Sequence, residues 1–210
     1  MFAALLWLGS LLGVRHAFEA DHLATVGSLA TGEARPLDVM RVAAAWGLGH
    51  AVVLLGAGAS MVAVGATFSP PMSQLLEGAV GVVLVILGID VLRRAREVHR
   101  HSPLTAIREP RPPLLRAFAI GALHGLEGSG AVVLIALPAL RSTAHALAYL
   151  AVFGVGSILG MIACSVALTL PLGALRRVQG SAAALQLAIG LSTLLIGGSM
   201  AFSALRITAN

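Results

Sequence analysis

Apolar residues dominate six long stretches of the chain, separated by shorter polar segments. The stretches cover residues 2–30, 42–66, 75–92, 115–137, 146–170 and 182–205. A helix needs about 20 mostly apolar residues to cross the hydrocarbon of a bilayer. All nine prolines stand outside these stretches, as expected because proline removes a backbone donor from a helix. The pattern predicts an all-α, polytopic membrane protein with six transmembrane helices.

Composition and charge support this class. The chain is 58% hydrophobic and 11% charged, with a mean hydropathy of +0.92, which excludes an ordinary soluble domain. The net charge of +5 does not indicate nucleic acid, because eleven of the fourteen basic residues, all arginine, lie in the loops after the first, third and fifth stretches. By the positive-inside rule these loops are cytoplasmic. We therefore expect a protein of the cytoplasmic membrane with both termini outside.

Two further features concern the N-terminal stretch and the single cysteine. The N-terminal stretch lacks a basic start and a clear cleavage site, so we interpret it as the first span and not as a signal peptide. The single cysteine, Cys164, excludes a disulfide within the chain and a thiolate metal cluster.

A weak internal repeat relates the two halves of the chain. His124 and Glu127 follow His16 and Glu19 at an offset of 108 residues, and several glycines match at offsets of 107 to 109. We interpret this as a duplication of three spans each. Because three is odd, the second copy inserts upside down, as in transporters with a site at the midplane. We expect the spans that carry His16 and His124 to pack against each other there.

The repeat divides the chain into three parts. Residues 1–92 form the first three-helix repeat, residues 93–114 a cytoplasmic linker rich in arginine and proline, and residues 115–210 the second repeat.

The most polar part of any stretch is His16-Ala-Phe-Glu-Ala-Asp-His22, in the middle of the first. A charge at the bilayer centre costs about 2.5 to 3.5 kcal/mol, and a leucine returns only about 0.3 to 0.6 kcal/mol. The carboxylates Glu19 and Asp21 must therefore face protein, water or an ion. On an ideal helix Asp21 points about 140° away from His16. Either Asp21 orients a neighbouring span, or the helix is unwound at this motif.

Two other spans carry the same residue types. The second contains His50, and the fourth contains His124 and Glu127 one turn apart. Imidazole and carboxylate ligands together suit Ni²⁺, Co²⁺, Zn²⁺ or Fe²⁺. The residues predicted to handle such an ion are His16, Glu19, Asp21, His22, His50, His124 and Glu127.

At these residues the chain resembles the nickel/cobalt permease family, most closely its six-span urease-accessory nickel permease branch. The resemblance rests on His16-Ala-Phe-Glu-Ala-Asp-His22-Leu23, Leu48-Gly-His50-Ala-Val-Val53 and His124-Gly-Leu-Glu127-Gly-Ser129. Glu19 stands where the family usually has aspartate, so metal preference does not carry over.

The resemblance implies a secondary permease for Ni²⁺ or Co²⁺, not an enzyme. The metal is its cargo, and no cofactor is bound permanently. Its partners would be the divalent ion, the lipid bilayer and metal chaperones or metalloenzyme maturation proteins. The chain has no Gly-x-x-x-x-Gly-Lys-Ser/Thr motif, so it lacks a recognisable ATP-binding loop.

Three alternatives remain open. Arg15 and Glu19 could form a structural ion pair at i,i+4. The pair His16 and Asp21 fits the His-x4-Asp pattern of an intramembrane lipid acyltransferase, although no glycerolipid-binding Pro-Glu-Gly segment is present. A haem-binding membrane protein would use His16 or His22 together with His50.

Overall fold

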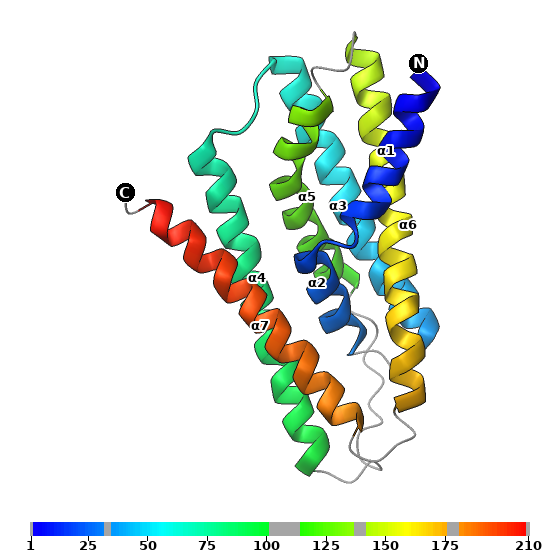
Figure 1. Ribbon diagram of the computed structural model, residues 1–210, viewed down its shortest axis with the longest axis vertical. Helices are drawn as coiled ribbons and strands as arrows, with labels where there is room; N and C mark the ends of the chain where they lie inside the picture. The colour runs from blue at the N-terminus through cyan, green and yellow to red at the C-terminus, as the bar shows by residue number, and fades with distance from the viewer. Residues whose placement is uncertain (1, 32–34, 101–113, 137–141, 176–180, 209–210) are drawn as a thin grey trace.

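The chain folds into a bundle of helices in the computed structural model, which describes residues 2–31, 35–100, 114–136, 142–175 and 181–208 (Figure 1). Within these residues there are seven helices: α1 (Phe2–His16), α2 (Ala20–Ala30), α3 (Pro36–Val64), α4 (Pro70–Arg100), α5 (Leu114–Ala136), α6 (Thr143–Leu175) and α7 (Ser181–Thr208). The prediction of an all-α protein is confirmed. Four helices, α3, α4, α6 and α7, are long and apolar enough over their described residues to cross a membrane, which makes this a membrane protein.

The first apolar stretch, 2–30, is not one continuous helix. Helix α1 ends at His16 and α2 begins at Ala20, so the chain is unwound through the middle of the histidine motif. The sequence left this possibility open beside a continuous helix, because the break contains neither glycine nor proline. It follows that the ideal-helix angles do not apply across the motif.

The backbone of the break is nevertheless hydrogen-bonded. The amides of Phe18 and Glu19 donate to the carbonyls of Arg15 and His16 at 2.9 and 3.0 Å. The thiol of Cys164 lies 3.8 Å from the carbonyl oxygen of Ala17, to which it donates. Unpaired backbone groups are costly inside a membrane, so these contacts are what allow the helix to be interrupted there.

Other boundaries differ from the pattern in smaller ways. Pro36 and Pro70 begin α3 and α4, where a missing amide hydrogen costs nothing. Helix α6 continues past Pro171 to Leu175. Helix α4 continues to Arg100, into the predicted linker; residues 101–113, which make up most of that linker, lie outside the described residues.

The helices pack in three main pairs, α4 with α7, α3 with α5 and α1 with α6, and α3 also packs on α6. Figure 1 shows that α1 and α6 run in the same direction, that α3 and α5 both run in the opposite direction, and that α4 and α7 are antiparallel. The expected direct packing of the spans that carry His16 and His124 is therefore wrong, because α1 lies mainly along α6 and α5 mainly along α3.

Glycines allow the closest of these helix approaches. A Cβ at Gly121 of α5 would overlap the carbonyl oxygen of Trp46 on α3, and one at Gly13 of α1 would overlap that of Phe153 on α6. Between α4 and α7, a Cβ at Gly81 would lie 2.8 Å from the carbonyl oxygen of Gly197. Small residues bring helices together in membranes in this way.

Candidate metal centre

The break between α1 and α2 places two helix ends within the bundle. The last turn of α1 carries Arg15 and His16, and the first turn of α2 carries Asp21. Basic groups suit the C-terminal end of a helix dipole and acidic groups the N-terminal end. Both helix ends are therefore electrostatically compatible with the groups they carry.

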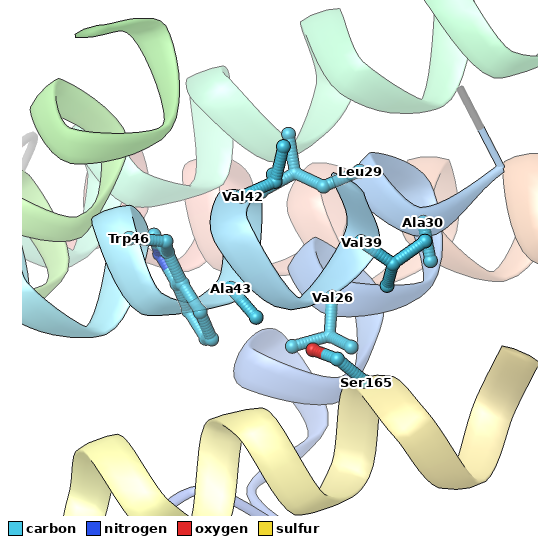
Figure 2. Close-up of a pocket in the computed structure, with 8 residues that line it drawn as sticks. All are labelled: Val26, Leu29, Ala30, Val39, Val42, Ala43, Trp46 and Ser165. Atoms are coloured by element: carbon cyan, nitrogen blue, oxygen red, sulfur yellow. The ribbon is translucent and has the colours of Figure 1, made fainter. Parts of the chain in front are cut away.

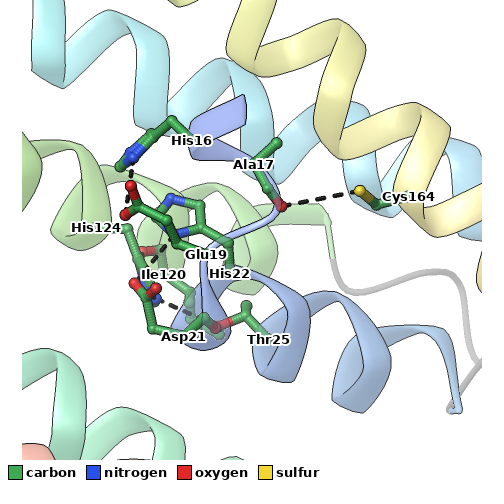
Figure 3. A network of polar contacts seen from close by, with 9 residues as sticks. All are labelled: His16, Ala17, Glu19, Asp21, His22, Thr25, Ile120, His124 and Cys164. Carbon is green, nitrogen blue, oxygen red and sulfur yellow. Dashed lines mark hydrogen bonds and ion pairs between the residues drawn. The ribbon is translucent and has the colours of Figure 1, made fainter. Parts of the chain in front are cut away.

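Four imidazoles gather around this break. His22 lies at their centre, with its ring centroid 4.3 Å from that of His16 and 5.3 Å from those of both His50 and His124. His22, His50 and His124 are fully buried, and the side chain of His16 is 11% exposed. Residues from α1, α2, α3 and α5 thus converge on one point (Figure 3 shows all but His50).

Two carboxylates accompany the imidazoles. The Glu19 carboxylate lies 3.0 Å from Nδ1 of His16. Asp21 Oδ2 lies 3.0 Å from Nδ1 of His22 and 3.9 Å from Nε2 of His124. Among the described residues no ion pair joins Arg15 to Glu19, so the structural pair considered from the sequence is not formed.

Several nitrogen atoms of this cluster have no hydrogen-bond partner. Among the described residues, these buried atoms include both ring nitrogens of His50 and Nε2 of His16 and of His22. Leaving a buried polar group unpaired costs roughly 1 to 3 kcal/mol. Their lone pairs are the donors that a transition-metal ion requires, and a neutral imidazole offers one of them directly.

The spacing of these atoms fits a single ion. Ligand atoms of His16, His22 and His50 lie within 4.8 Å of one another, as do those of Glu19, Asp21 and His22. Nitrogens bound at about 2.1 Å can be at most about 4.2 Å apart. Small side-chain rotations would therefore close either group around a cation, and His22 belongs to both.

His124 is held by neighbours on both sides of its ring. Its Nδ1 lies 3.0 Å from the carbonyl oxygen of Ile120, which can only accept, so Nδ1 carries the proton. Its Nε2 lies 3.2 Å from Oγ1 of Thr25, and the single hydroxyl proton of Thr25 can be donated either to this nitrogen or to the carbonyl oxygen of Asp21 at 2.8 Å (Figure 3). With Nδ1 protonated, Nε2 of His124 carries a lone pair on the side of Thr25, and it accepts the hydroxyl proton when Thr25 turns that proton away from Asp21.

The predicted residues all lie in this region, but within the described residues Glu127 is not paired with the imidazoles. Glu127 lies on α5 beyond His124 and lines a cavity together with His16 and Glu19. No hydrogen bond or ion pair joins Glu127 to the imidazoles in the described part of the chain. The expected link between the two half-motifs passes instead through His22, which lies between His16 and His124.

The opposite side of the cluster is closed by apolar side chains. The fully buried ring of Trp46 lies 5.4 Å from that of His22. Next to Trp46, between α2, α3 and α6, is a cavity of about 10 Å³ whose walls are apolar except for Ser165 (Figure 2). A volume of that size holds about one water molecule, so the described residues around Trp46 leave little space for an ion on this side.

Thr25 and Trp46 are neighbours of the cluster that the sequence analysis did not single out. Thr25 follows Asp21 by four residues, which places both on one face of a helix, and this spacing could have revealed it. Trp46 gave no such signal, since an apolar aromatic residue in a span is ordinary.

The comparisons with known proteins agree with the three motifs. The family model of the HupE/UreJ proteins matches residues 7–205. The chain belongs to the HupE/UreJ family. This confirms the resemblance to urease-accessory permeases that the motifs indicated.

Two curated proteins are similar to the chain. The urease accessory protein UreH of Bacillus sp. (strain TB-90) is 30% identical over 176 residues, which cover 80% of this chain and 77% of that protein. The chloroplast protein FOR GROWTH AND FERTILITY 1 of Arabidopsis thaliana is 28% identical over 180 residues, covering 74% of this chain but only 47% of the plant protein. No solved structure matches.

Proposed function

We propose that the protein is a secondary transporter that carries Ni²⁺ or Co²⁺ across the cytoplasmic membrane, and that it is not an enzyme. The metal is cargo, held briefly by His16, His22 and His50 with Glu19 and Asp21. The observation that carries the proposal is the group of buried imidazole nitrogens that converge, unpaired, on the break between two half-helices. Interrupted helices at the midplane are a common way to build an ion site in transporters.

The ligand types favour a borderline transition metal. Three imidazoles with one or two carboxylates are softer than the all-oxygen sites of Mg²⁺ and Ca²⁺ and harder than thiolate sites. His124, held by Ile120 and Thr25, extends this set on the other side of His22. Glu127 would offer a carboxylate to the same ion earlier or later on its path.

The helix arrangement supports the proposed inverted repeat of residues 1–92 and 115–210. In such a repeat, α1, α3 and α4 correspond to α5, α6 and α7 in that order. Exchanging the two halves then turns the α1–α6 pair into the α5–α3 pair. The α4–α7 pair is turned into itself. These are the main packing pairs. In this scheme α1 and α2 together count as one of six spans.

Glycine contacts support the same correspondence in detail. Gly13 and Gly121, 108 residues apart, face the carbonyl oxygens of Phe153 and Trp46, which are 107 residues apart. Two close helix contacts whose residues are related by nearly the same offset are expected from a duplication. Helix packing alone does not require such a relation.

The relative named as a urease accessory protein favours nickel as the cargo and metalloenzyme maturation proteins as recipients. The arginine distribution favours both termini outside and the linker at 93–114 inside. The membrane potential would then draw a divalent cation inward with about 4.6 kcal/mol per 100 mV, twice the value for a single charge.

The two alternative functions fit the contacts less well. An acyltransferase needs Asp21 to orient His16, yet the carboxylate of Asp21 lies against His22 and that of Glu19 against His16. A haem needs its two axial histidines on opposite faces of a porphyrin. The rings of His16 and His22 both lie 5.3 Å from the ring of His50, which leaves no room for a macrocycle between them.

The test is uptake of radiolabelled Ni²⁺ by cells that express the chain, with Co²⁺ and Zn²⁺ as competitors. His22→Ala should reach the membrane at near-normal levels and abolish uptake, because His22 belongs to both ligand groups. His145→Ala is the matched control, since His145 pairs with Ser142 near the start of α6, away from the cluster. Normal uptake by His22→Ala would refute the proposed path.

A further inference from the structure

A cavity of about 320 Å³ opens beside His16, between α1, α5 and α6. We call it the vestibule. One part of its wall is polar and contains Arg15, His16, Glu19 and Glu127; the rest is apolar and aromatic, with Phe153 among its residues. The vestibule is lined from the last turns of α1, the second half of α5 and the first part of α6, whereas the small cavity next to Trp46 is lined from α2, α3 and the later part of α6.

The vestibule is larger than a hydrated metal ion requires. Six waters occupy about 180 Å³ at roughly 30 Å³ each, well below the volume of the cavity. The excess corresponds to a small organic molecule of several non-hydrogen atoms beside the ion. Phe153, which is only 4% exposed, belongs to the apolar side of the cavity wall, and its ring centroid lies 5.5 Å from that of His16.

Arg15 is out of place in a site for a bare cation. Its side chain lines the vestibule and is exposed, and among the described residues no ion pair neutralises it. A guanidinium repels a divalent cation at short range, so its position next to His16 would weaken the approach of a free ion. The same group binds a carboxylate through two parallel hydrogen bonds.

The unpaired Nε2 of His16 also faces this side. It lies 3.5 Å from the position that a Cβ on Gly128 would occupy, and Gly128 lines the vestibule. The nitrogen itself is buried, and with glycine at 128 no side chain of that residue stands between it and the vestibule. A rotation of the His16 side chain, which is 11% exposed, would bring this free donor to a metal in the vestibule.

We propose that the vestibule binds the metal as a complex with a small carboxylate-bearing chelator. Arg15 binds a free carboxylate of the chelator, while Glu19 and His16 approach the metal. The metal then exchanges its bonds to the chelator, one at a time, for bonds to His16 and His22. The chelator leaves with its donor electron pairs, and no oxidation occurs. This inference rests on the proposed transport function.

The experiment compares uptake of radiolabelled Ni²⁺ at one fixed free-ion concentration, with no chelator and with an excess of citrate or histidine. In the native protein the chelator should raise uptake several-fold at constant free Ni²⁺. Arg15→Gln should remove that increase, while uptake of the free ion should stay at least at the native level, because a positive charge beside His16 is lost. Arg41→Gln, an exposed arginine paired with Asp38 on α3, is the matched control and should retain the increase.

Each other outcome has one meaning. If native uptake follows free Ni²⁺ alone, or if Arg15→Gln loses uptake with and without chelator equally, the chelate proposal is overturned while transport stands. If the native protein takes up no metal in any form, the proposed function itself fails. Should Arg15→Gln not reach the membrane, Arg15→Lys keeps the charge without the planar fork and should still reduce the chelator-dependent increase.

Discussion

His22 is the central residue of the candidate site. It is fully buried, it lies within 5.3 Å of three other imidazole rings, and its Nδ1 lies 3.0 Å from the carboxylate of Asp21. A buried polar group of this kind is tolerated only when something satisfies it. The neighbours that position its ligand partners are therefore as informative as the ligands.

Thr25 is such a neighbour, and its hydroxyl group can be removed with little change of shape. Thr25→Val deletes the oxygen between Asp21 and His124. We expect the KM for Ni²⁺ uptake to rise about tenfold, the low end for loss of a group that orients a metal ligand, with little change in protein level. Thr25→Ser should restore a near-native KM. A KM unchanged in Thr25→Val would show that His124 does not need this contact.

At this scale the sequence predicted most of the site. The structure brings the predicted residues into one region, while their role as metal ligands stays a prediction: His16, Glu19, Asp21, His22, His50, His124 and Glu127. The motif spacing could not predict which carboxylate faces which ring, because that depends on the backbone path through residues 17–19.

The helices meet the site through glycine. Because Gly121 of α5 has no side chain, the backbones of α3 and α5 approach each other closely at Trp46. This approach is what places His50 and His124, from different helices, around the same imidazole of His22. The packing expected for the first and fourth spans was wrong because it was inferred from the repeated histidine motif, and two copies of a repeat can correspond to each other without touching.

A matched pair of glycine substitutions tests this packing. Gly121→Ala should lower the free energy of unfolding in detergent by about 1 to 3 kcal/mol, because the added methyl group overlaps α3. Gly56→Ala, where nothing lies within 4 Å of the new methyl group, should be neutral or stabilising by about 0.5 to 1 kcal/mol. Equal unfolding temperatures for the two variants would contradict the close crossing.

The break between α1 and α2 is the element that the sequence described least well. Residues 17–19 are Ala, Phe and Glu, none of which interrupts a helix by its own conformational preference. The only indication was the angle between Asp21 and His16, because a regular helix could not direct both side chains toward one ion. Tertiary contacts, including the one between Cys164 and Ala17, determine the outcome.

Over the whole molecule, the direction of successive helices carries a prediction about topology. The start of α1 and the end of α7 lie toward the same end of the bundle (Figure 1), and the arginine distribution favours the outside for that end. A reporter active only in the cytoplasm should give no signal after Asn210 and a strong signal when it follows Arg100, the end of α4. The reverse pattern would invert the assignment and place the vestibule on the inner face.

The closure beneath the imidazoles has a consequence for electrical behaviour. An ion held at His22 and His50 would face Trp46 and a cavity that holds about one water molecule, so the residues that the structure describes form a barrier on this side of the proposed site. Each ion must wait for the helices to rearrange before it moves on. Planar-bilayer recordings should therefore show no unitary current steps, and flux should level off at a ceiling set by the rate of rearrangement, however steep the metal gradient becomes.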